Sequence, residues 1–91
     1  MTWNINITAP SRSQAKNAVA AALAKSMSVM SEHALDFEFV LRTLFAAIDL
    51  VEEGTVSVNA TGYLSVGYEI TPPVVTGVYI TSMYVTSAPK A

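Results

Sequence analysis

Residues 55–66 read Thr-Val-Ser-Val-Asn-Ala-Thr-Gly-Tyr-Leu-Ser-Val, and this segment decides which sheet the chain can build. Apolar and polar residues alternate at both of its ends, as is typical of half-buried strands. Between them, Asn59–Gly62 is rich in residues that favour tight turns. The segment therefore predicts a β-hairpin whose arms are Thr55–Val58 and Tyr63–Tyr68.

Downstream of this hairpin, a longer loop is predicted for residues 70–77, because Pro72 and Pro73 lack the amide donors of a central strand. The last strand is predicted at Val78–Thr86. Its apolar side chains point to both faces, which is typical of an inner strand. One face would carry Val78 and Ile80, and the other Tyr79, Met83 and Val85.

Upstream of the hairpin, an apolar residue at every second position of residues 3–7 predicts a first strand. Ser11 and Gln14 then form a capping-box pattern, which opens an Ala-rich helix at about residues 11–26. The buried stripe of this helix is expected to consist of Ala15, Ala18, Val19, Ala22 and Leu23.

A second helix is predicted after a connection at residues 26–31, with Ser31 as a candidate cap. It runs to about Glu53 and is terminated by Gly54. Glu52 and Glu53 would then oppose the helix dipole by about 0.3–1 kcal/mol each. The apolar stripe of this helix is expected to consist of Phe37, Leu41, Leu44, Ile48 and Val51.

These elements predict one α+β domain, residues 1–91, in the order β-α-α-β-β-β. A four-stranded antiparallel sheet with the strand order 2-3-4-1 would place the last strand inside, and both helices would pack on one face. The helix-covered face would carry Trp3, Ile5, Ile7, Val56, Val58, Leu64 and Val66. The other face would carry Asn4, Asn6, Ser57, Tyr63, Ser65, Tyr79 and Met83.

The charge distribution predicts assembly with other protein. Only 13% of the residues are charged and 52% are hydrophobic, and from Gly54 to Pro89 the only ionised side chain is Glu69. Sheet edges are normally protected by Lys, Glu or Pro, so this uncharged sheet indicates a homo-oligomer. The alternative is an ordinary sheet face in contact with water.

Several functions are disfavoured by the residue inventory. One His and no Cys exclude cysteine nucleophiles and Cys-based zinc sites. His33 and Asp36, three apart on a helix, could orient a base or hold a metal with a third ligand, but the favoured interpretation is a histidine hydrogen-bonded within its own helix start. We therefore expect no catalytic residue, metal or cofactor, and no enzyme. The net charge of −2 and the scattered basic residues argue against nucleic-acid binding. The sequence contains no run of about 20 apolar residues, so we expect no membrane span.

A candidate anion site lies directly after the first strand. A helix N-terminus offers free amides, and the hydroxyls there, together with nearby basic side chains, can surround a phosphate or carboxylate. The candidate ligand-binding residues are Ser11, Arg12, Ser13, Lys16 and Arg42. The alternative is that the same residues serve only to cap the helix.

The opening strand Thr2–Thr8, the Ala-rich helix, the segment Val56–Ser65 and the tripeptide Ile80–Ser82 resemble small uncharacterised proteins encoded by tailed bacteriophages. The resemblance implies a cytoplasmic accessory protein of the infected bacterial host. Such a protein could sequester an anionic, nucleotide-like immune signal as a homo-oligomeric counter-defence factor. The alternative is a protein–protein inhibitor or structural adaptor that docks on a host or phage protein through the uncharged sheet.

Overall fold

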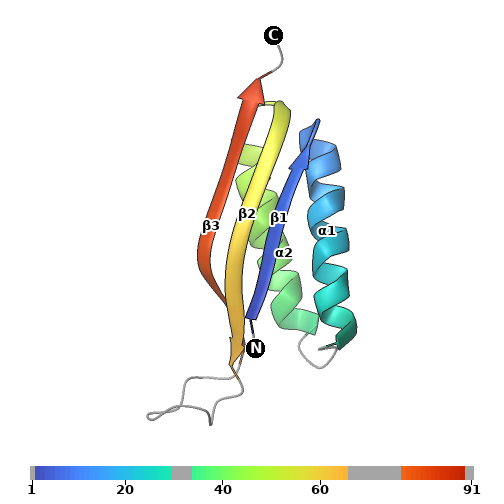
Figure 1. Cartoon of the computed structure of the whole chain (residues 1–91), viewed down its shortest axis with the longest axis vertical. Helices are drawn as coiled ribbons and strands as arrows, with labels where there is room; N and C mark the ends of the chain where they lie inside the picture. The colour runs from blue at the N-terminus through green and yellow to red at the C-terminus, as the bar shows by residue number, and fades with distance from the viewer. Residues whose placement is uncertain (1, 30–33, 66–76, 90–91) are drawn as a thin grey trace.

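The described residues fold as one three-stranded antiparallel sheet with two helices on one of its faces (Figure 1). This computed structural model describes residues 2–29, 34–65 and 77–89. The predicted α+β class and both helices are confirmed, and the strand order is β1-β2-β3. The elements are β1 (Thr2–Ala9), α1 (Arg12–Val29), α2 (Ala34–Leu50), β2 (Gly54–Ser65) and β3 (Gly77–Pro89).

The predicted four-stranded sheet with β-α-α-β-β-β order is wrong, because residues 54–65 form one continuous strand in a β-α-α-β-β chain. Gly62, which was expected in a turn, lies in the middle of the sheet opposite Trp3. A Cβ atom at this position would collide with the indole ring of Trp3 and with the carbonyl oxygen of Tyr79. The glycine is needed for close packing and not for a turn.

The predicted strand order 2-3-4-1 is also wrong, because β2 is central and β3 is an edge strand. The misleading signal was an irregularity in β3. In the register, Gly62 pairs with Ile80 and Thr61 pairs with Ser82, so Thr81 has no partner and forms a bulge. One extra residue reverses the alternation of side chains beyond it.

The reversal places Met83 and Val85 on the helix side of the sheet, opposite the buried Ala60 and Val58. The prediction that Met83 lies on the open face is therefore wrong. The last strand has its large aliphatic residues and Met83 on the helix side only, and Tyr79 and Tyr84 on the open face, as expected of a half-covered edge strand. Its sequence looked two-sided because a regular period of two was assumed.

Both helices differ from their predicted bounds. Helix α1 extends to Val29, through most of the predicted connection, and α2 ends at Leu50, before the predicted end at Glu53. The predicted cap Ser31, His33 and the predicted loop at residues 70–77, except for Gly77, lie outside the described residues.

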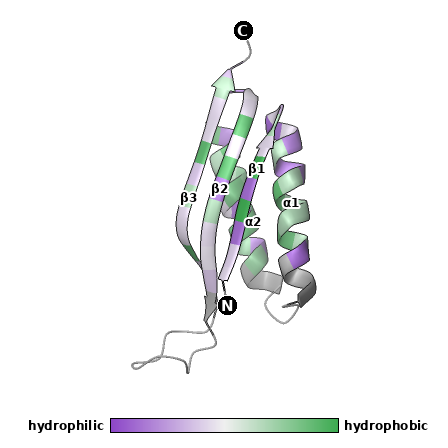
Figure 2. Cartoon of the chain, in the orientation of Figure 1, coloured by the Kyte–Doolittle hydropathy of each residue, from purple (hydrophilic) through white to green (hydrophobic). Residues whose placement is uncertain are grey.

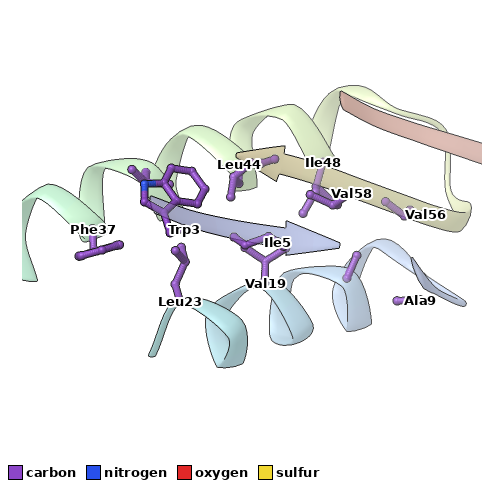
Figure 3. Close-up of a cluster of buried hydrophobic side chains, with 13 residues drawn as sticks. Trp3, Ile5, Ala9, Val19, Leu23, Phe37, Leu44, Ile48, Val56 and Val58 are labelled. Carbon is purple, nitrogen blue, oxygen red and sulfur yellow. The ribbon is translucent and has the colours of Figure 1, made fainter. Parts of the chain in front are cut away.

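A single core joins the helices to the sheet (Figure 3). Helix α1 packs against β1 and β2, and α2 packs against α1 and β3. Most of the predicted apolar stripes are buried, and the rest of them are partly buried. The buried core consists of Trp3, Ile5, Ala9, Ala15, Val19, Leu23, Phe37, Val40, Leu44, Ile48, Val56, Val58 and Ala60.

Candidate interaction surface

The start of α1, where the anion site was predicted, is capped by the chain itself. The Ser11 hydroxyl accepts a hydrogen bond from the Gln14 amide at 3.1 Å, and the Ser11 carbonyl accepts one from the Ala15 amide at 2.9 Å. Ser13 is exposed. The hydroxyl contact is the N-cap half of the predicted capping box.

A carboxylate already occupies this helix N-terminus. Oε1 of Glu53 accepts hydrogen bonds from the backbone amides of Arg12, at 2.8 Å, and Gly54, at 3.0 Å. Nε of Arg12 lies 3.6 Å from the other carboxylate oxygen. The amide of Arg12, with smaller contributions from Gly54 and the guanidinium, lowers the pKa of Glu53 below its ordinary value of 4.5, although partial desolvation opposes this. Glu53 therefore links the start of α1 to the start of β2.

The two cations on α1 face the end of α2. Nη1 of Arg12 donates to the carbonyl oxygens of Asp49, at 3.4 Å, and Val51, at 3.5 Å. Nζ of Lys16 lies 2.6 Å from Oδ1 of Asp49 and 5.6 Å from the centre of the Phe45 ring. These contacts satisfy carbonyls at a helix C-terminus and hold the two helices together.

Arg42 is separate from this group. Its Nη2 lies 2.6 Å from Oε1 of Glu38, one turn earlier on α2. It precedes Asp49 by seven residues on the same helix, or about 10 Å along the axis. The structure thus brings Ser11, Arg12 and Lys16 together at the junction of the helices, and it pairs Arg42 elsewhere.

Sequence reasoning missed the partners of these cations, Asp49 and Glu53. A signal was present in Glu53, whose charge is unfavourable at the end of a helix but favourable at the start of one. Because α2 ends at Leu50, Glu53 lies beyond it, at the N-terminus of α1. The predicted dipole mismatch at this residue disappears.

We expect Glu53→Gln to destabilise the fold at neutral pH and to have a smaller effect in acid. Glutamine can still accept the amide hydrogen bonds but lacks the charge that favours the helix start. A carboxylate with a lowered pKa contributes stability above its unfolded pKa, and this contribution disappears as the pH falls through the folded pKa. Urea unfolding at pH 7 and below pH 4 should show the difference between the two proteins shrinking.

The matched control is Glu52→Gln, which removes the same charge from the neighbouring exposed residue. We expect a much smaller effect from this variant. The contact of Glu53 with the start of α1 would not act as described if both variants lost the same free energy of unfolding. The same would follow if the loss in Glu53→Gln did not depend on pH.

The open face of the sheet consists of cross-strand rows without charge. Each row joins one residue from each strand, in the register of the ladder. The rows are Thr2–Tyr63–Tyr79, Asn4–Thr61–Ser82, Asn6–Asn59–Tyr84 and Thr8–Ser57–Thr86.

Direct contacts order part of this face. The rings of Tyr63 and Tyr79 stack with their centres 5.0 Å apart and their planes at 19°. The Thr61 hydroxyl lies 2.7 Å from that of Ser82 and 3.1 Å from that of Thr81, and the hydroxyls of Thr8 and Ser57 are 3.3 Å apart. The hydroxyls bond to one another across strands, so the chain itself orders these side chains.

Charge is separated from the sheet throughout the described residues. None of the three strands contains Lys, Arg, Asp or Glu, and the ion pairs involve the helices and the link after α2. In Figure 2, which is coloured by hydropathy, β3 is pale along most of its length, whereas β1 and the helices carry purple positions. The described strands therefore lack the charged side chains that normally protect sheet edges from pairing with other strands.

Comparison with known proteins finds no matching family model, no matching curated protein and no matching solved structure. Among the described residues, no group of three or more His, Cys, Asp or Glu side chains is placed to hold a metal ion. Within the same residues, no helix has the length and apolar character needed to cross a membrane.

Proposed function

We propose that this chain is a non-enzymatic protein that assembles with copies of itself through its sheet. The observation that carries the proposal is the absence of charge from all three strands, together with an open sheet face and an exposed edge. In a monomer, such a surface would leave a template for pairing with other strands unprotected. In an assembly, the same surface becomes an interface.

Binding of an anionic, nucleotide-like molecule by a phage counter-defence protein has less support. Arg12, Lys16 and Arg42 each have a carboxylate of the same chain within ion-pair distance. An external anion would have to displace Glu53 from the start of α1, where two amides and a guanidinium already bind it. The self-assembly proposal requires no such exchange.

We expect the absolute mass in solution, measured by light scattering over a range of concentrations, to be a multiple of the chain mass of 9.7 kDa. Assembly buries apolar surface that a domain of this size cannot bury alone. A mass of 9.7 kDa at every concentration would overturn the proposal. That result would instead favour a monomeric adaptor or inhibitor that docks on a different protein.

A further inference from the structure

Strand β3 has a long free edge. Among the described residues it pairs only with β2, and its 13 residues, Gly77–Pro89, contain no charged side chain. At about 3.3 Å per residue, this edge is about 40 Å long. The other edge strand, β1, has 8 residues and is about 23 Å long. Within the described part of the chain, the outer edge of Ser82–Ala88 faces no partner strand.

Exposed large apolar side chains occur on both faces of the edge strand β3 and on α2. The large hydrophobic residues that remain exposed are Phe39 (67%), Leu50 (88%), Met83 (37%) and Tyr84 (68%). Two of them lie on β3, and the other two lie on α2, which contacts β3. None of the described large hydrophobics on β1 or α1 is exposed to this degree.

The two residues on α2 share one side of that helix. Phe39 and Leu50 are about three turns apart, so their side chains point in similar directions. The side of α2 that meets α1 is marked by Phe45 and Asp49, both of which face Lys16. Phe39 and Leu50 lie away from it, so this apolar stripe is not used by the chain's own helix pair.

We infer that a second copy of this chain pairs its β3 antiparallel with this β3, so that two sheets form one continuous sheet of six strands. The inference rests on the proposed self-assembly and names its surface. A two-fold axis perpendicular to the sheet relates the copies, and it leaves the helices of both copies on the same face. Helix α2 of each copy then lies beside its equivalent, with Met83 near the seam and with Phe39 and Leu50 on the outer side of the paired helices, opposite the buried Phe37, Leu44 and Ile48.

The size and chemistry of this side fit a second copy. The sheet layer offers a strip about 40 Å long and about 10 Å high, and the 17-residue α2 adds one about 25 Å long and about 10 Å high. Together they cover about 650 Å² per partner, which is within the range of stable interfaces. Identical strands without charge meet with no electrostatic repulsion. The bulge at Thr81 interrupts the ladder with β2, and the segment Ser82–Ala88 continues it in regular register.

The test is Met83→Lys, followed by light scattering and circular dichroism. Lys is a common protecting residue of natural edge strands, and the half-exposed position of Met83 lets its charged end reach water in a monomer. At the seam, two such charges would lie close together and lose water. We expect the wild type to be a dimer or an assembly of dimers, and the variant to dissociate at concentrations at least about 100-fold higher than the wild type does.

The matched control is Ala21→Lys, which places the same charge on an exposed position of α1 and should leave the mass unchanged. Asn59→Lys places it in the centre of the open face. If Asn59→Lys dissociates the assembly and Met83→Lys does not, the copies meet by their faces, and the edge pairing is wrong although self-assembly stands. A monomeric wild type would contradict both the edge pairing and the proposed self-assembly.

A second measurement keeps the inference testable if Met83→Lys fails to fold. The chain contains no Cys, so single cysteines can be placed along β3 from Ser82 to Thr86. In an antiparallel pair of identical strands, disulfide-linked dimer should be strongest at the position nearest the two-fold axis and fall away on both sides. Ala21→Cys, on the exposed side of α1, is the control and should give little disulfide-linked dimer. Equal crosslinking at β3 and at the control would overturn the pairing.

Discussion

Phe37→Ala should lower the free energy of unfolding by about 3–5 kcal/mol. Phe37 is the largest of the fully buried side chains and lies in the core beneath the sheet, near Trp3 and Leu23 (Figure 3). Truncation loses its apolar burial and leaves a cavity. Since a domain of this length has a total stability of about 5–14 kcal/mol, the variant should be partly unfolded or close to it. Urea titration followed by circular dichroism measures the loss.

The same substitution two residues later is the control for this prediction. Phe39 lies on the same helix but is largely exposed, so Phe39→Ala should cost at most about 1 kcal/mol. Both variants should be compared in the Met83→Lys background, where self-association makes no contribution. Similar losses at the two positions would mean that α2 is rotated about its axis from the orientation described here.

Gly62→Ala should be the second severe change, with a cost of about 3 kcal/mol. Alanine is normally no worse than glycine within a strand, and often better. Here, the added methyl group meets the Trp3 indole and the backbone oxygen of Tyr79, which belongs to the neighbouring strand. The sheet or the indole must shift to admit it. Thermal and urea unfolding should both register the loss.

Two further variants locate the cause of that loss. Asn59→Ala, at an exposed position of the same strand, should change stability by about 0.5 kcal/mol or less. If the indole is the obstacle, Gly62→Ala should cost less in a Trp3→Leu background than alone, which is a direct measure of coupling. A turn glycine would show no such coupling, so an additive result would count against the packing role of Gly62.

Local patterns predicted the elements well but not the sheet they form. The period of the apolar residues identified β1 and most of both helices, because these elements bury one regular face each. The segment at residues 59–62 was read as a turn, since Asn and Gly favour turns locally. What overrides this preference is Trp3, about 60 residues away in the chain, whose ring requires a glycine on the facing strand.

The bulge at Thr81 explains the error in strand order in the same way. No local signal distinguishes a strand with apolar residues on two faces from a bulged strand with one apolar face, and the first interpretation placed β3 inside the sheet. The capping contact of Ser11 was predictable because both partners lie within one turn. The ion pairs of Arg12 and Lys16 were not, since they join helices that only the folded core brings together.

The position of β2 in the chain also governs the order of events during synthesis. Each residue of β1 pairs with one that follows it by 47 (Ala9 with Val56) to 61 (Thr2 with Tyr63) positions. At about 5–20 residues per second, β1 leaves the ribosome roughly 3–12 s before its partner exists. In that interval, α1 and α2 are the only described elements available to cover the apolar side chains of Trp3 and Ile5. The arrival of the central strand then completes the buried core, and β3, which is made last, adds afterwards as the second edge.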